Sequence, residues 1–360
     1  MKEFISVLVV DDSAFMRKSL TIMLESDPGI KVVGTARNGE EGLIQAKNLK
    51  PDIITLDIEM PVMDGLTALK RIMSECPTSV LMVSSLTTEG AQATIKALEL
   101  GAVDFIPKEL SFVSVNITNI KDDLIQKIKE FVRQKQLKER LARIKISSGP
   151  QLRKTLTFSR DIPSIGYKAV ALGISTGGPF TLQKVLPALS AKLNVPFFIV
   201  QHMPPKFTKS LAERLNGLSA LEVKEAEDGE EVKSNVVYLA PGGLHMKLKK
   251  NGLSSFAINI TREPNDSLHR PSVDVMMNSV IDIYGKYTLG VIMTGMGKDG
   301  FEAVRNLKSI GGYAIAQEEE SCVVYGMPKA IVDAGYADAI LAAEKIPELI
   351  NKVVANGRQV

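Results

Sequence analysis

The chain has 360 residues, enough for two domains of ordinary size. Its formal net charge of +3 is too small for a protein whose main work is to coat nucleic acid or an anionic membrane. Hydrophobic residues at 45% and charged residues at 24% exclude wholesale disorder, and two cysteines cannot build a disulfide framework or a four-thiolate metal site.

The amino-terminal segment lacks the long apolar stretch and the cleavage site of a signal peptide. No run of about 18 apolar residues occurs, so no membrane span is expected. We therefore expect a cytoplasmic protein that does not insert into a membrane and does not bind nucleic acid, and we expect it to be a monomer.

Strands and helices alternate in the first third of the chain. Short apolar runs typical of strands buried on both faces alternate with segments of helical periodicity. The expected strands are 5–10, 30–35, 52–56, 79–83 and 103–106, and the expected helices are 13–25, 39–48, 64–74 and 89–98. This order predicts a doubly wound α/β domain with a parallel sheet, whose ligands bind at the carboxyl ends of the strands.

Residues 112–145 lose the strand pattern and are expected to be helical, with a second half rich in Lys and Arg. No aromatic residues alternate with these charges, so a solvated helical face is favoured over an RNA-binding surface. Ser147-Ser148-Gly149-Pro150 then marks a boundary. This part of the chain is interpreted as a last helix that leads into a linker.

A second α/β pattern begins at Tyr167. Strands are expected at 169–172, 197–201, 236–239 and 289–293, and helices at 181–189, 208–215, 273–283 and 301–307. Residues 243–260 have the character of a hairpin that turns at Asn251-Gly252.

Acidic residues follow two strands of the first domain. Asp11 and Asp12 come just after the first strand, and Asp57 ends the third. Carboxylates that converge at one sheet edge repel each other unless a cation neutralises them, and oxygen ligands of this kind suit Mg²⁺. Ser84 and Lys108, at the ends of the next two strands, would add a hydroxyl and an ammonium group. Together these groups predict a phosphoryl-accepting site.

These five positions and the stretch DIEMPVMDG around Asp57 resemble the receiver domain of bacterial response regulators, over about residues 3–120. The resemblance implies that Asp57 accepts the phosphoryl group and that Asp11, Asp12 and Asp57 hold Mg²⁺. It also implies that Ser84, Lys108 and Phe105 are switch residues. One departure is Glu109, which follows Lys108 where receivers usually have proline, so the usual cis peptide after the lysine is not expected.

The stretch Gly173-Ile174-Ser175-Thr176-Gly177-Gly178-Pro179 follows a short apolar strand and opens a helix. As G-x-S-x-G it is a nucleophile elbow that lifts the Ser175 hydroxyl above the sheet. The same stretch can also be interpreted as a glycine-rich phosphate-binding loop, or Ser175 as a simple helix cap. This motif alone does not decide between these interpretations.

A serine nucleophile needs a base, and the chain has three histidines. His202 directly follows the expected strand 197–201, and this placement favours it over His245 and His269 without excluding them. Asp299, after the strand 289–293, could orient the imidazole. The order Ser, His, Asp differs from that of α/β-hydrolases. No paired histidines are spaced for zinc, so a zinc hydrolase is not expected.

The stretches GISTGGP, QHMPP, APGG, HRPSVD and TGMGKDG occur in the order seen in the chemotaxis methylesterase family, which the chain resembles over nearly its whole length. The resemblance implies a receiver domain at 3–120, a helical linker at 121–165 and a catalytic domain at 166–356. The fold implied is two doubly wound parallel-sheet domains, a flavodoxin-like receiver and a Rossmann-like three-layer methylesterase.

By the same resemblance, the enzyme hydrolyses γ-glutamyl methyl esters on chemotaxis receptors and deamidates certain receptor glutamines. Ser175 would be the nucleophile, His202 the base and Asp299 the orienting acid, with the backbone N–H of Met296 and Thr176 stabilising the oxyanion. The resemblance also implies a chemotaxis histidine kinase as phosphodonor and an unphosphorylated receiver that covers the cleft. The esterase site is expected to use no cofactor, whereas the receiver uses Mg²⁺. His269, Ser272 and Asp274 are left outside the catalytic set, because a helix start after Pro271 explains them as well as substrate contacts do.

Two other functions are alternatives to the hydrolase. A receiver joined to a small-molecule or nucleotide-binding module without catalysis would fit the glycine-rich loop. A DNA-binding regulator is disfavoured because the second domain shows strands rather than a compact helix-turn-helix.

Overall fold

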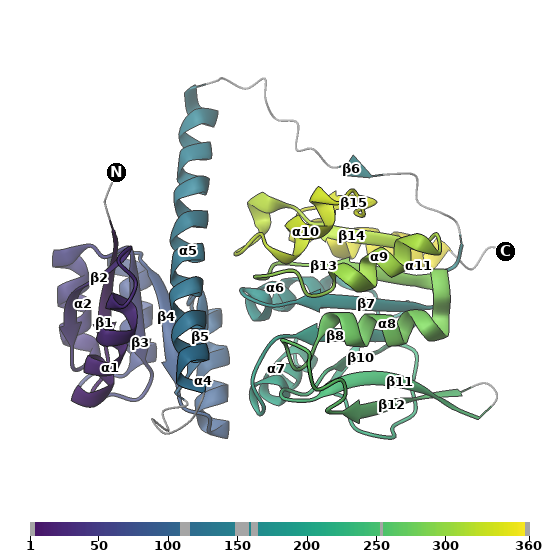
Figure 1. The fold of residues 1–360 in the computed structure, drawn as a ribbon, viewed down its shortest axis with the longest axis horizontal. Helices are drawn as coiled ribbons and strands as arrows, with labels where there is room; N and C mark the ends of the chain where they lie inside the picture. Colours follow the sequence, from purple (N-terminus) through teal and green to yellow (C-terminus); the bar gives the residue numbers. More distant parts are fainter. Residues whose placement is uncertain (1–3, 109–115, 148–157, 160–164, 253–254, 357–360) are drawn as a thin grey trace. The chain divides into compact units, whose positions relative to one another are not determined.

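The computed structural model describes residues 4–108, 116–147, 158–159, 165–252 and 255–356. The chain divides into two compact units, Met1–Ser148 and Gly149–Val360. Each unit is an α/β structure with a mainly parallel sheet, as expected (Figure 1). In the described part of the chain, no helix is both long and apolar enough to cross a bilayer.

The first unit has a five-stranded parallel sheet in the order β2-β1-β3-β4-β5. This flavodoxin-like order places β1 and β3 side by side, so the residues that follow them share one sheet edge. The strands are β1 (Ile5–Val10), β2 (Ile30–Ala36), β3 (Ile53–Asp57), β4 (Ser79–Ser84) and β5 (Asp104–Pro107).

Helices cover both faces of this sheet, with α1 beside α5 and with α2, α3 and α4 in sequence on the other side (Figure 1). Side chains of Ser13 and Asp64 cap the first turns of α1 and α3 by accepting backbone N–H groups. The helices are α1 (Ala14–Glu25), α2 (Gly39–Leu49), α3 (Gly65–Glu75), α4 (Thr88–Glu99) and α5 (Asn116–Ser147).

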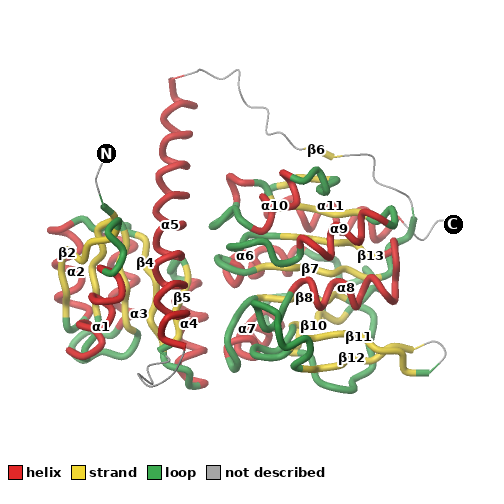
Figure 2. The backbone as a smooth tube through the Cα atoms, in the orientation of Figure 1, coloured by secondary structure: helices red, strands yellow, loops and turns green. Residues whose placement is uncertain are grey.

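Helix α5 continues without interruption from 116 to 147 and includes the basic segment (Figure 2). Leu124, Ile128 and Phe131 are buried, so its first half packs in the core of the unit. The expected change from receiver to linker at residue 120 lies within this helix, and the domain bounds stay predictions.

The second unit contains an eight-stranded sheet in the order β6-β15-β14-β13-β7-β8-β10-β9. All its pairings are parallel except that of β6 with β15. The strands are β6 (Phe158–Ser159), β7 (Ala169–Ile174), β8 (Phe197–Gln201), β9 (Glu222–Glu225), β10 (Val236–Leu239), β13 (Thr288–Ile292), β14 (Tyr313–Gln317) and β15 (Ala339–Leu341). From β7 the chain passes through β8 to the edge strand β9, comes back to β10 and then crosses to β13 on the other side of β7. The connection therefore changes direction beside β7.

One face of this sheet packs against α8, α9, α10 and the hairpin of β11 (His245–Asn251) and β12 (Ser255–Thr261), which form one apolar core with it. Helices α6, α7 and α11 cover the other face (Figure 1). The helices are α6 (Gly178–Val185), α7 (Phe207–Asn216), α8 (Val273–Tyr284), α9 (Phe301–Ser309), α10 (Met327–Asp333) and α11 (Ile346–Asn356). Short 3-10 turns are η2 (Leu186–Ala188), η3 (Gly285–Tyr287), η4 (Glu319–Ser321) and η5 (Ala343–Lys345).

The expected elements correspond to observed ones with shifts of a few residues, and the hairpin around Asn251-Gly252 is confirmed. The start of the helix expected at 181 was wrong: α6 begins at Gly178, because Pro179 is tolerated in a first helical turn. Strands β6, β9, β14 and β15 and helices α10 and α11 were not anticipated.

Gly173 in β7 allows α8 to pack closely on the sheet. A Cβ atom at this position would lie 2.3 Å from Cγ1 of Val273, the first residue of α8. We expect Gly173→Ala to lower the free energy of unfolding of the second unit by about 1 to 3 kcal/mol, because α8 would have to move away. Urea unfolding measures this change.

The matched control is Gly217→Ala in the same unit. Gly217 has φ −68° and ψ −13°, a conformation alanine adopts without strain, and the nearest atom to its added Cβ is 3.6 Å away. This variant should unfold at the wild-type urea concentration or slightly above it. Equal destabilisation by the two substitutions would contradict the packing argument.

Candidate functional site

The first site lies where β1 and β3 end in the first unit. Asp11 and Asp57 are buried and Asp12 is exposed, and one carboxylate oxygen of each lies within 4.8 Å of the other two. Lys108 Nζ lies 3.1 Å from Asp11 Oδ2 and 2.7 Å from Asp57 Oδ2. One ammonium group therefore faces three carboxylates, which leaves an excess of negative charge.

The pKa of Asp57 is affected by its burial and by this excess of negative charge. Burial, with the nearby Asp11 charge, raises the pKa of Asp57 to about 6 although Lys108 opposes the shift. The carboxylate faces a pocket of about 230 Å³ lined by Asp12, Asp57, Ile58, Glu59, Ser85 and Lys108. Converging carboxylate oxygens with uncompensated charge fit a hard divalent cation such as Mg²⁺.

The structure does not bring the Ser84 hydroxyl to this pocket. Ser84 is fully buried, and its Oγ donates to the Gly90 carbonyl oxygen at 3.1 Å, whereas Ser85 lines the pocket. Phe105 on β5 is buried as well. The peptide bond between Lys108 and Glu109, where the sequence departs from the receiver pattern, lies outside the described residues.

The second site lies where β7, β8 and β13 end, beside the change of direction in the sheet. Ser175 follows β7, His202 follows β8, and Asp299 lies in the loop after β13. The Ser175 N–H donates to the Thr294 carbonyl oxygen at 2.9 Å, and the His202 N–H donates to the Ile174 carbonyl oxygen at 3.2 Å. These bonds continue the strand pairing and bring the three loops together.

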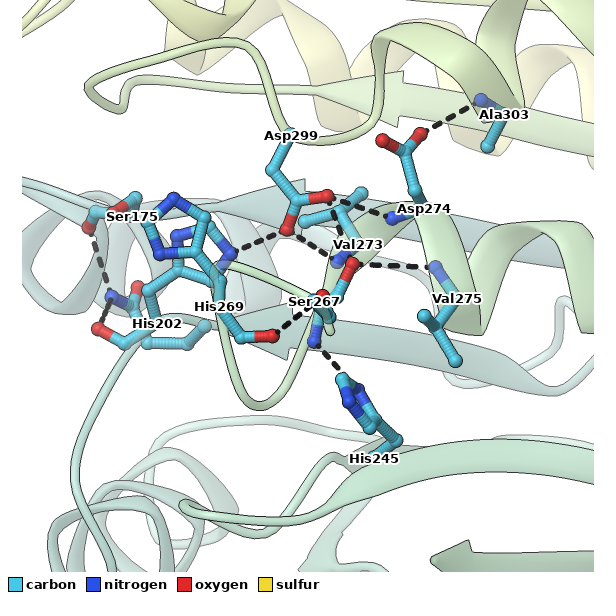
Figure 3. Close-up of polar contacts among 12 residues, drawn as sticks. Ser175, His202, His245, Ser267, His269, Val273, Asp274, Val275, Asp299 and Ala303 are labelled. Atoms are coloured by element: carbon cyan, nitrogen blue, oxygen red, sulfur yellow. Dashed lines mark hydrogen bonds and ion pairs between the residues drawn. The ribbon is translucent and has the colours of Figure 1, made fainter. Parts of the chain in front are cut away.

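The imidazole of His202 is oriented by Asp299. His202 Nε2 lies 2.8 Å from Asp299 Oδ2, and the two side chains are only 11% and 8% exposed (Figure 3). An ionised carboxylate only accepts hydrogen bonds, so Nε2 carries the proton and Nδ1 has the free lone pair. This is the reverse of the serine-protease arrangement, in which Nδ1 faces the acid.

Asp299 accepts hydrogen bonds from the first turn of α8 as well. Ser272 Oγ donates at 3.0 Å and the N–H groups of Val273 and Asp274 donate at 2.7 and 3.0 Å (Figure 3). Burial opposes ionisation, but the hydrogen bond from His202 and these backbone N–H groups hold the pKa of Asp299 below its ordinary value. Asp299 is therefore a charged acceptor at neutral pH.

Ser175 and His202 are held next to each other through their backbones. Gln201 Nε2 donates to the carbonyl oxygens of both residues, at 2.9 Å to Ser175 and 3.2 Å to His202. Within the described residues, His202 Nδ1 is buried without a hydrogen-bond partner, and no hydrogen bond joins it to Ser175 Oγ.

The expected oxyanion donors lie in the same loops. Thr176 is buried, and Met296 lies in the loop between Thr294 and Asp299. Their backbone N–H groups are not taken up by a hydrogen bond within the described part of the chain. Their role as oxyanion donors stays a prediction.

The other two histidines have different surroundings. The exposed ring of His269 stacks on His202 with centroids 4.3 Å apart and planes at 19° (Figure 3). His245 is fully buried below them and contacts Ser272 rather than Ser175.

Sequence reasoning missed Gln201, the His269 stack and the donors at the start of α8. Gln201 lies beside His202 in the stretch QHMPP. For Ser272 and Asp274 the sequence left a helix start and substrate contacts equally open, and the structure places both residues at the start of α8. No sequence pattern shows that this helix start faces Asp299.

The fold and these sites define a class of protein: a receiver domain joined to a hydrolase domain that is built on a mainly parallel sheet. Family models for the response regulator receiver domain and for the CheB methylesterase match residues 7–116 and 170–350. The chain belongs to the protein-glutamate methylesterase/protein-glutamine glutaminase family.

Two similar proteins match this chain over nearly its whole length. A protein of this name from Nitratidesulfovibrio vulgaris is 51% identical over 352 residues, covering 94% of this chain and 96% of its own. One from Thermotoga maritima is 46% identical over 355 residues, covering 97% and 98%. The crystal structure of the Thermotoga maritima CheB methylesterase catalytic domain aligns with a TM-score of 0.51 and 46% identity, over 52% of this chain and all of that one.

Asp274 provides a test of the electrostatics at the start of α8. Burial, with the neighbouring Asp299 charge, raises the pKa of Asp274 to about 6. The folded state then binds more protons than the unfolded state between about pH 4 and pH 6, so Asp274 lowers stability as the pH rises through this window. Asp274→Asn, which keeps the acceptor for the Ala303 N–H, should stabilise the second unit above pH 6 by about 1 to 3 kcal/mol.

Urea unfolding at about pH 4, where the window begins, and at about pH 7, above its upper end, measures the effect. The exposed Asp282→Asn in the same helix serves as control and should change stability little at either pH. An advantage for Asp274→Asn that does not grow with pH would contradict the prediction.

Proposed function

We propose that this chain is a phosphorylation-activated enzyme that hydrolyses glutamate γ-methyl esters on methyl-accepting chemotaxis receptors and deamidates certain receptor glutamines. The observation that carries the proposal is the hydrogen bond from His202 to a charged Asp299, with Nδ1 unpartnered beside the Ser175 loop. The names of the relatives supply the substrate class.

In the proposed reaction, Ser175 Oγ attacks the ester carbonyl carbon while His202 Nδ1 takes the hydroxyl proton. Negative charge that develops on the carbonyl oxygen would be stabilised by the N–H groups of Met296 and Thr176. As the tetrahedral intermediate breaks down, His202 gives its proton to the leaving methoxide oxygen, which departs as methanol, or to the leaving amide nitrogen of a glutamine, which departs as ammonia. Water attacks the acyl-enzyme with His202 again as base, which releases glutamate and restores Ser175.

Asp299 acts here through its charge and its fixed position. It keeps the proton on Nε2, so that Nδ1 remains the base, and its charge stabilises the imidazolium formed in each step.

The receiver unit supplies regulation in this proposal. A chemotaxis histidine kinase is the proposed phosphodonor and Asp57 the acceptor, with Asp11, Asp12 and Asp57 holding Mg²⁺. The ion would neutralise the carboxylates and the incoming phosphoryl oxygens. Lys108 already lies at Asp57, whereas the Ser84 hydroxyl must leave the Gly90 carbonyl oxygen to reach the phosphoryl group, which is the change expected of a switch residue.

Ser175→Ala should abolish methanol release from methylated receptor membranes, because the substitution removes the proposed nucleophile. Asp299→Asn should lower kcat by roughly 10³- to 10⁴-fold, since a neutral amide neither fixes the tautomer nor stabilises the imidazolium. The control is Ser309→Ala at the exposed end of α9, which should keep wild-type activity. Wild-type release by Ser175→Ala would refute Ser175 as the nucleophile, whereas no release by the unsubstituted chain would favour a binding module without catalysis.

Asp57→Asn should keep the basal rate of methanol release but lose its stimulation by a small-molecule phosphodonor with Mg²⁺. The amide cannot form the acyl phosphate, whereas the esterase residues are unchanged. Asp27→Asn, at an exposed ion pair with Lys129 in the same unit, is the control and should be stimulated like the wild type. Full stimulation of Asp57→Asn would refute phosphorylation of this residue as the trigger.

A further inference from the structure

His245 is a fully buried histidine that the proposed reaction does not use. It is the first residue of β11, and both of its ring nitrogens contact the backbone. Nδ1 accepts the N–H of Ser272 at 3.2 Å, and Nε2 lies 3.2 Å from the Pro264 carbonyl oxygen. Since Nδ1 accepts, Nε2 must carry the proton and donate to that carbonyl.

These two contacts hold both ends of the segment 264–272, which reaches the proposed triad at two points. His269 within the segment stacks on the His202 ring. Ser272 at its end donates through Oγ to Asp299 at 3.0 Å, and the same Oγ accepts the Val275 N–H as the cap of α8 (Figure 3). One buried imidazole thus fixes the segment that contacts the base and the acid.

The surroundings of His245 favour the neutral ring with its single proton on Nε2. Burial lowers the pKa of His245, and the positive charges of Arg270 and Lys247 act in the same direction, although the Pro264 contact and the Asp299 charge oppose them. A second proton would place a donor on Nδ1 against the Ser272 N–H and break that bond.

We propose that His245 is a positioning residue for the catalytic centre, which holds the segment 264–272 so that Ser272 orients Asp299 and His269 stays on His202. The inference rests on the proposed function for the roles of His202 and Asp299. It assigns the two contacts of His245 unequal importance: the bond to Ser272 leads directly to Asp299, whereas the bond to Pro264 holds only the far end of the segment.

Two near-isosteric variants separate these contacts. In His245→Asn the side-chain oxygen lies near the position of Nδ1 and can accept the Ser272 N–H. In His245→Gln the amide nitrogen lies near Nε2 and can donate to Pro264. His245→Ala removes both contacts. Tyr238→Phe, which removes a buried hydroxyl that bonds Lys233 and Glu231 in the same unit, controls for a general loss of stability.

The activity assay is methanol release by the full chain with phosphodonor and Mg²⁺, at a temperature where each variant is folded. We expect kcat to fall about 10- to 100-fold in His245→Gln and His245→Ala with little change in KM. His245→Asn should keep most of kcat, and Tyr238→Phe should match the wild type.

A second readout does not depend on catalysis. Because the chain has three histidines, NMR spectra of ¹⁵N-histidine-labelled protein can follow the Nε2–H of His202 that bonds Asp299. We expect this proton resonance to stay in place in His245→Asn and to shift or broaden in His245→Gln and His245→Ala. If the proposed function is wrong, the wild type will release no methanol. The His202 resonance should still stay in place in His245→Asn and change in His245→Gln and His245→Ala.

The proposal is overturned if the folded Asn and Gln variants lose kcat equally, which indicates a general disturbance of the core. It is also overturned if both keep the wild-type kcat and the His202 resonance, because His245 would then only stabilise the fold.

Discussion

The carboxylate of Asp299 and its four donors are the interaction on which the second unit's site depends. A buried carboxylate costs several kcal/mol unless hydrogen bonds replace its water. Here one ring nitrogen, one hydroxyl and two backbone N–H groups do so. The backbone donors belong to the start of α8, where the helix dipole also favours negative charge. The fold thus keeps Asp299 ionised, and the ionised group determines which nitrogen of His202 is free.

The acidic site of the first unit shows what happens when donors are too few. The side chains of Asp11 and Asp57 are even less exposed than that of Asp299, but a single ammonium group from Lys108 serves both. One Asp57 oxygen also accepts the Ile58 N–H, and burial still raises the pKa of that carboxyl. A carboxylate that accepts enough hydrogen bonds is stable without an ion. A carboxylate whose negative charge is not balanced favours the binding of a cation.

Much of both sites was predictable because the residues that bear the chemistry directly follow apolar strands. Asp57, His202 and Ser175 each come after a run of buried residues, and a parallel sheet brings such positions to one edge. Strands with a weaker apolar signal were missed: β14 is rich in alanine, and β9 is a charged edge strand. The donors to Asp299 were missed for another reason, since a backbone N–H carries no mark in the sequence and its direction depends on how α8 packs on β7.

The two buried histidines illustrate why position in the sequence alone could not choose the base. Both His202 and His245 follow or begin a strand, and both are held by an acceptor at Nε2. The difference lies at Nδ1, which accepts the Ser272 N–H in His245 and has no partner in His202 within the described residues. A lone pair already engaged by a backbone N–H cannot take a proton from a serine without breaking that bond. The free lone pair at Nδ1 therefore favours His202 as the proposed base, and it is visible only once the backbone around each ring is known.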